Sequence, residues 1–414
     1  MSKRNIRSVL GPGLLYAGAA VGVSHLVQST RAGAGYGFDL LWILILANII
    51  KYPFFEFGSR YAAATGNNLI TGYSRIGKWA VILFAVLTLS TMFSVQAAVT
   101  IVTAGLAANV TGVELDPVGI SAMILIGTMV ILMIGRFAVL DKLIKLVIIM
   151  LTASTFVAVF SALAKGYEPD PLLANDFTWG RLSDMFFLIA FVGWMPAPLD
   201  VTVWQSLWTV EKGKNLKFRP KIREVLVDFK VGYIGTAILA VCFLTLGAYV
   251  MHGSGRDLSS TGVIFADQLL EMYTENIGRW SYYIIAIAAL TTMFSTTLTC
   301  LDAYPRVMKP LTHILFPKIR QGGHETWIWL IVVVAGSLAV MTLLSSTMGI
   351  MVDIATTLSF ITAPLLAVLN YRVVTDKHMP EESRPGMWLR IYAWAGTAFL
   401  GLFTLVYLFW RFLF

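Results

Sequence analysis

The chain has 414 residues, of which 57% are hydrophobic and only 13% are charged. Charged residues alone make up about 25% of a typical soluble domain, so this composition excludes an ordinary water-soluble protein and predicts one that lies in a lipid bilayer. The net charge of +8 would also suit nucleic acid, but the basic residues gather in short loops between apolar runs, which argues against that partner. Cys242 and Cys300 are too few for a disulfide framework and have no metal-type spacing.

Apolar runs long enough to cross a membrane recur along the whole chain. A helix needs about 20 residues to cross the hydrocarbon layer. The runs of this length are 12–31, 38–62, 79–108, 117–137, 141–165, 183–207, 229–251, 280–303, 326–346, 351–373 and 387–412. They predict an all-α membrane protein of about 11 transmembrane helices, with no soluble domain between them.

The distribution of lysine and arginine predicts the orientation. Lys3, Arg4 and Arg7 precede the first run, and alternate loops, beginning with the one after 38–62, are rich in basic residues. The intervening loops are poor in them, and 168–176 is acidic. Because cytoplasmic loops carry the excess of positive charge, we expect a cytoplasmic N-terminus and an external C-terminus, in a plasma (inner) membrane.

Two of the runs are interrupted at corresponding places, five helices apart. The first contains Gly22, Ser24 and His25, and the sixth contains Val192-Gly193 followed by Met195-Pro196-Ala197-Pro198. Glycine lowers helix stability, and proline removes a backbone donor and clashes with the preceding turn. Paired broken helices indicate a transporter of two inverted repeats, whose unwound backbone lines a shared cavity. The alternative is two kinked helices that pack through small residues.

Ionisable residues inside the predicted helices are a second indication of function. Lys51 and Glu56 lie in the second run, Asp200 follows the break in the sixth, and Asp302 lies near the cytoplasmic end of the eighth. An isolated charge at the bilayer centre costs about 2.5–3.5 kcal/mol on insertion scales, so such residues are paired or hydrated. We expect Lys51 to pair with one of the carboxylates, either for ion coupling or as a structural ion pair.

Short motifs follow one another in a characteristic order. The first run opens with Gly11-Pro12-Gly13-Leu14-Leu15, and further segments are Ala32-Gly33-Ala34, Leu40-Leu41-Trp42, Met195-Pro196 and Ser295-Thr296-Thr297. In this order the motifs resemble the Nramp family of metal-ion transporters over nearly the whole chain. The resemblance implies the LeuT-type fold, with two inverted five-helix repeats (12–165 and 183–373) and one additional helix (387–412) in a single transmembrane domain, 1–414. It also implies alternating access and coupling to protons.

The sequence departs from this family where the family binds its metal. The family motif Asp-Pro-Gly-Asn corresponds here to Gly22-Val23-Ser24-His25, so both of its side-chain ligands are replaced. In the sixth helix the family uses a backbone carbonyl, here that of Val192, and a methionine, here Met195. The histidine that follows in the family is Ala197, and Val95 and Ala98 occupy the approximate positions of its acidic pair. The scaffold is retained, and the site is rebuilt.

Coordination chemistry limits what a rebuilt site binds. His25 and Met195 offer a soft nitrogen and sulfur pair that suits a transition metal, while hydrated Mg²⁺ would bind through water near Asp200. Alternatively, the positive ends of the broken helices, with His25 and Lys51, favour a small anionic or zwitterionic solute. His25 is also explained as a hydrogen-bonded helix residue, without a role in binding.

The residues favour a transporter and not an enzyme. The sequence contains no nucleotide-binding loop and no zinc-ligand spacing, and adjacent Ser24 and His25 would face different directions on a helix. We expect no resident cofactor, and as partners the lipid bilayer and the transported ion or solute; a monomer is favoured. A sensor or scaffold that keeps the fold but transports nothing is the remaining alternative.

Overall fold

The protein is entirely helical in the residues that the computed structural model describes, which are 11–134, 137–215, 220–318, 322, 324–344 and 347–413. Lys3, Arg4 and Arg7 lie outside the described residues. The helices are α1 (Pro12–Ala20), the π-helix η2 (Val23–Ser29), α2 (Thr30–Tyr36), α3 (Leu41–Thr65), α4 (Leu69–Ile76), α5 (Lys78–Thr111), α6 (Pro117–Ile134), α7 (Phe137–Lys165), α8 (Leu182–Trp194), α9 (Val201–Asn215), α10 (Ile222–Met251), α11 (Gly262–Ile277), η3 (Arg279–Ser281), α12 (Tyr282–Leu315), α13 (Glu325–Leu344), α14 (Met348–Thr375), η4 (Glu381–Ser383) and α15 (Met387–Leu413).

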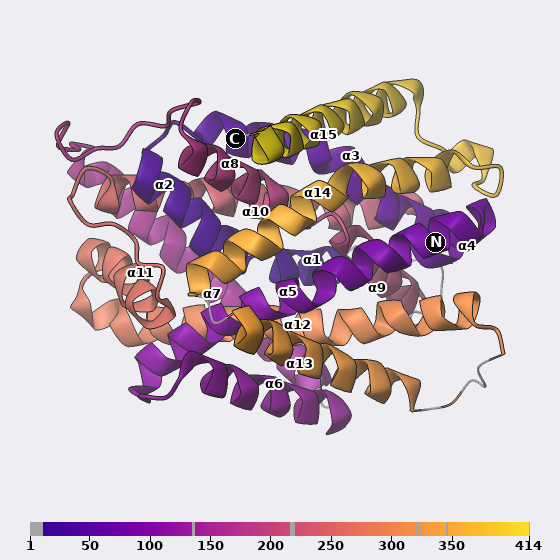
Figure 1. Cartoon of the computed structure of the whole chain (residues 1–414), viewed down its shortest axis with the longest axis horizontal. Helices are drawn as coiled ribbons and strands as arrows, with labels where there is room; N and C mark the ends of the chain where they lie inside the picture. Colours follow the sequence, from indigo (N-terminus) through magenta and orange to yellow (C-terminus); the bar gives the residue numbers. More distant parts are fainter. Residues whose placement is uncertain are drawn as a thin grey trace, which may run out of the picture.

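Most of the predicted membrane helices are present at the expected places. Within the described residues, 8 helices are long and apolar enough to cross a membrane. The first and sixth runs are not among these because each is divided into shorter helices, and the fifth is represented only by the shorter apolar stretch Ile149–Lys165. The count of 11 therefore stays a prediction. The prediction missed α4 and α11, and it ended the eighth helix too early, since α12 continues to Leu315. In Figure 1, α4 and α11 lie at opposite ends of the bundle.

The breaks in the first and sixth helices are confirmed. The first helix stops at Ala20, and a π-helix resumes at Val23 after Val21 and Gly22. The sixth stops at Trp194 and resumes only at Val201, because Pro196 and Pro198 have no N–H to continue the backbone ladder. Four short helices therefore end in the interior of the bundle, and their terminal peptide groups need other partners.

Close backbone contacts hold the divided first helix against α10. A Cβ atom added at Gly13 would lie 2.1 Å from the carbonyl oxygen of Asp228, and one at Gly232 would lie 2.2 Å from the carbonyl oxygen of Gly13. Gly33 and Gly247 make equally close approaches between α2 and α10. Small residues permit such contact between membrane helices, so α10 is the surface on which both halves of the first helix are positioned.

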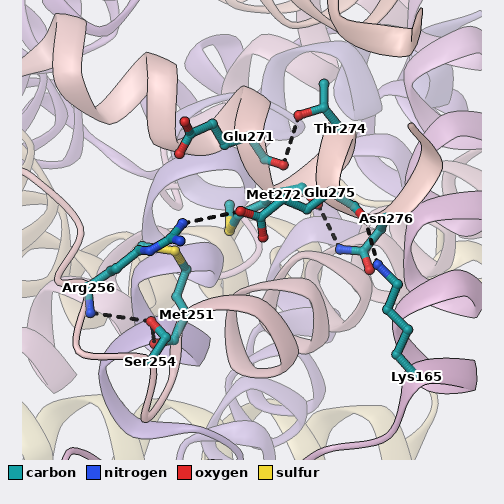
Figure 2. A network of polar contacts seen from close by, with 9 residues as sticks. All are labelled: Lys165, Met251, Ser254, Arg256, Glu271, Met272, Thr274, Glu275 and Asn276. Atoms are coloured by element: carbon teal, nitrogen blue, oxygen red, sulfur yellow. Dashed lines mark hydrogen bonds and ion pairs between the residues drawn. The ribbon is translucent and has the colours of Figure 1, made fainter. Parts of the chain in front are cut away.

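The outer connections are fixed by polar contacts with α11. Figure 2 shows Lys165, at the end of α7, donating to the carbonyl oxygen of Glu275 at 2.6 Å, and Arg256 forming an ion pair with the Glu275 carboxylate. Ser161 on α7 donates to the carbonyl oxygen of Asn276. These contacts tie α11 to the end of α7.

Gly232→Ala is expected to destabilise the protein by about 1–3 kcal/mol, because the new Cβ forces α1 away from α10. Gly235→Ala, on the same helix, is the matched control, since a Cβ there meets nothing within 4 Å. Thermal unfolding of the purified protein in detergent measures both. Equal unfolding temperatures for the two variants would contradict the close packing.

Candidate transport site

The two broken helices meet at Ser24 and Pro196. The Ser24 hydroxyl lies 2.5 Å from the carbonyl oxygen of Ala20, 3.2 Å from that of Pro196 and 2.7 Å from Nδ1 of His25. One hydroxyl thus spans the gap between the end of α1, the start of η2 and the unwound segment of the sixth helix. The structure thus brings the first break, at Ser24 and His25, into contact with the unwound segment of the sixth helix.

Gly22 lets α12 approach the first break. A Cβ at Gly22 would lie 2.5 Å from Oγ1 of Thr296, and that hydroxyl is 3.4 Å from the carbonyl oxygen of Gly18. Thr296 therefore occupies the space beside the unwound turn, within the motif Ser295-Thr296-Thr297 that the sequence analysis singled out. Glycine is required here by contact with α12.

His25 faces α10. Its Nε2 atom lies 2.9 Å from the carbonyl oxygen of Thr236, and because a carbonyl only accepts, this nitrogen carries a proton. The other ring nitrogen, Nδ1, forms a hydrogen bond with the Ser24 hydroxyl. In this conformation the side chain is a buried, hydrogen-bonded helix residue, which was the alternative to metal binding, and its unprotonated Nδ1 can bind a metal only if the hydrogen bond with Ser24 is released.

The end of α8 is bound by Lys51 of α3. The Nζ atom lies 2.6 Å from the carbonyl oxygen of Val192 and 2.8 Å from that of Gly193. Met195, which follows these carbonyls, is fully buried. The Val192 carbonyl, which the Nramp resemblance assigns to the metal, is therefore bound by the ammonium group of Lys51. The expected pairing of Lys51 with a carboxylate is wrong.

The two carboxylates considered for that pair have other partners. Glu56 forms an ion pair with Arg60 at 2.6 Å and accepts from the hydroxyl of Tyr52. Asp302 forms an ion pair with Arg306 at 2.6 Å. In both cases the carboxylate forms its ion pair with an arginine one helical turn further along the same helix. Neither carboxylate therefore contacts the broken helices through this pair.

Asp200 lies directly before α9, at the other side of the unwound segment. Its side chain is buried, and neither carboxylate oxygen has a hydrogen-bond partner among the described residues. The positive end of α9 attracts negative charge to this position. A buried carboxylate is costly unless it is hydrogen-bonded, paired or protonated, so Asp200 is a candidate to take up a proton or a cation.

Two further residues support the site that the sequence analysis did not predict. Asp228 of α10 accepts from the N–H groups of Gly11 at 3.1 Å and Gly13 at 2.7 Å, and thereby caps the start of α1. Gln96 of α5, between the replaced positions Val95 and Ala98, donates to the carbonyl oxygen of Thr297. Asp228 lies just before the expected start of its helix at 229, which is why it was missed.

The ends of the bundle differ around this site. At the α4 end, a cavity of about 860 Å³ reaches inward to Leu15 and Leu207 and is lined by Lys212, Arg306 and Lys309 among others. It stops seven residues before Gly22, about 10 Å along a helix. At the α11 end, Arg31 of α2 forms an ion pair with Asp353 of α14 at 2.8 Å. A smaller cavity of about 270 Å³, lined by Arg31, Tyr36 and Asp184 among others, lies at this end, so the deeper approach to the break is from the α4 end.

The ligands present do not form a ready metal site. No group of three or more His, Cys, Asp or Glu side chains suited to a metal occurs among the described residues. His25 and Asp200 are the ionisable side chains of this kind at the breaks, and they belong to different breaks, His25 to the first and Asp200 to the sixth. A bound metal would therefore depend on backbone carbonyls, Met195 and a rearranged His25.

An all-helical membrane protein whose first and sixth helices are divided in this way has the LeuT-type fold. The sequence profile of the Natural resistance-associated macrophage protein-like family matches residues 13–410. The chain therefore belongs to the Nramp family, whose members are transporters and not enzymes.

Relatives agree with this membership. An uncharacterised protein of Pasteurella multocida, PM0681, is 37% identical over 407 residues, or 97% of this chain and 92% of its own. The divalent metal cation transporter MntH of Acidiphilium cryptum is 35% identical over 66 residues, only 16% of this chain and 15% of its own. A crystal structure of an Eremococcus coleocola manganese transporter mutant superposes with a TM-score of 0.72 at 14% identity, covering 97% of this chain and 86% of that one.

Gly22→Ala is expected to destabilise the protein by about 1–3 kcal/mol, because the new methyl group meets the Thr296 side chain. Thr296→Ala in the same molecule removes the two nearest atoms, Oγ1 and Cγ2, and should recover much of that loss. A double-mutant cycle of unfolding temperatures measures the coupling. Strictly additive effects would show that α12 does not press on the first break.

Proposed function

We propose that this chain is a secondary transporter that works by alternating access around the two broken helices. The observation that carries the proposal is the junction of Ser24 with the Pro196 carbonyl, which lies between a cavity at one end and the Arg31–Asp353 ion pair at the other. Loosening the ion pair and closing the cavity would present the same unwound segments to the opposite side. The predicted orientation makes the cavity cytoplasmic, in a plasma membrane.

A divalent metal cation is the first cargo to test. Family membership and the name of the Acidiphilium cryptum relative support it. On this proposal the metal is held by Met195, His25 and backbone oxygens, with Asp200 neutralising charge, in place of the family's Asp and Asn. Proton coupling through Asp200 makes the transporter a symporter.

A small organic or anionic solute is the second candidate, and two observations favour it. The ammonium of Lys51 already holds the carbonyls of Val192 and Gly193, and the cavity contains Lys212, Arg306 and Lys309. Its carboxylates Glu211 and Asp302 are paired with Lys214 and Arg306 respectively, which leaves the lining with an excess of positive charge. Such a lining raises the local concentration of anions.

Uptake into proteoliposomes, with binding titrations of Mn²⁺ and Mg²⁺, decides between the cargoes. If metal is carried, Met195→Ala and His25→Ala should each lower Mn²⁺ uptake about tenfold or more, because each removes a ligand. Met341→Ala in α13 and His252→Ala in the outer loop are the matched controls. Absence of any divalent binding at millimolar concentration would reject metal as the cargo, and a signal with small organic anions would select the second candidate.

Asp200→Asn is expected to abolish the dependence of uptake on a pH gradient while protein folding is kept. The reason is that Asp200 is the buried carboxylate beside the break without a partner among the described side chains, and an amide cannot take up and release the coupled proton. Asp267→Asn, on the exposed face of α11, is the control. Uptake by the Asp200 variant that still follows the pH gradient would remove Asp200 from the coupling path.

A further inference from the structure

Lys51 is a charged side chain in an unusual position. It lies in the middle of α3, it is fully buried, and its ammonium binds two consecutive carbonyls in the last turn of α8 at 2.6 and 2.8 Å. These distances are in the range of charge-assisted hydrogen bonds. Since an ammonium has three donors, two of them are engaged by the backbone alone.

The end of α8 is an environment built for a positive charge. The last carbonyls of a helix have no partner within the helix, and together they carry about half a negative charge. In α8 the Val192 carbonyl accepts a long hydrogen bond of 3.3 Å from the Met195 N–H, and Pro196 and Pro198 have no N–H to continue the ladder. A carbonyl oxygen has two lone pairs, so these oxygens can still bind a cation. A cation placed there by α3 satisfies both the hydrogen bonds and the charge.

The surrounding carboxylates are committed elsewhere. Glu56, one turn and a half from Lys51 on α3, is bound by Arg60, and Asp302 is bound by Arg306. In the part of the chain that the structure describes, no ion pair of Lys51 with an acidic side chain is formed. The ammonium is therefore held by backbone oxygen, as a bound ion would be.

We propose that Lys51 is a tethered cation that occupies the cation-binding carbonyls of Val192 and Gly193, and that free cations compete with it for them. What Lys51 does to the cargo rests on the proposed function. A metal reaches these carbonyls when Lys51 withdraws, whereas an anionic solute binds beside a lysine that stays in place. Lys51 thus determines specificity at the broken end of α8. This role rests on the geometry and is independent of which cargo is carried.

Chemical rescue of Lys51→Ala tests the tethered cation directly. The truncation leaves space for n-propylammonium, which matches the missing atoms beyond Cβ, and 1-propanol is its uncharged equivalent. We expect the variant to unfold about 5–10 °C below the wild type, and n-propylammonium, K⁺ or Na⁺ to restore at least half of that loss. Neither 1-propanol in the variant nor the cations in the wild type should have this effect.

Lys165→Ala is the matched control, because Lys165 also donates to a backbone carbonyl, that of Glu275 at 2.6 Å (Figure 2). This contact lies at the exposed outer end of α7. It should unfold near the wild-type temperature and show no rescue. Lys51→Arg retains the charge and should fold without added cations, which separates loss of charge from loss of packing.

The outcomes are distinct. Rescue by cations and not by 1-propanol supports the tethered cation, including the case in which Lys51→Ala folds only when cations are present during purification. A variant as stable as the wild type, rescue by 1-propanol to the same extent, or failure with every cation while Lys51→Arg folds would overturn it. If neither the wild type nor any variant takes up metal, but cations still rescue Lys51→Ala, the metal cargo is rejected and the tethered cation is retained.

Discussion

Peptide groups that leave a helix inside a membrane must find partners within the protein, and this requirement shapes the whole site. Hydrocarbon offers no hydrogen bonds, so each broken end must be satisfied by a side chain, another backbone group or a cargo. Lys51 takes the last carbonyls of α8, and the Ser24 hydroxyl joins the first break to the carbonyl of Pro196. Asp228 caps the other end of α1, away from the break. Each of these contacts joins helices that are distant in sequence.

These partners also set the electrostatics of the centre. A positive group stands at the carbonyl end of α8, and a negative group, Asp200, stands at the amide end of α9, so each side chain complements the helix end beside it. This arrangement differs from a metal centre that collects several anionic ligands at one point. Lys51 and Asp200 thus place opposite charges at the two ends of the unwound segment of the sixth helix.

The scaffold was largely predictable, because it rests on patterns that are local in sequence. Length and apolarity located the membrane helices, and Gly22, Pro196 and Pro198 located the breaks, since their effect on a helix does not depend on the fold. The partner of Lys51 could not be predicted in this way. Sequence reasoning paired it with a carboxylate, but Arg60 and Arg306, each four residues from Glu56 and Asp302, were closer partners for those acids. Asp228 escaped notice because its role depends on where α1 starts relative to α10, which no local pattern encodes. The short helices α4 and α11 lacked the length that identified the others.

The account is tested most directly by a density map of the wild-type protein in lipid nanodiscs, at a resolution that shows side chains around the end of α8. It predicts that the helix stops near Trp194 and that the Lys51 amine lies within hydrogen-bond distance of the two preceding carbonyl oxygens. A sixth helix that continues without interruption through Pro196, or a Lys51 side chain directed away from it, would contradict the account.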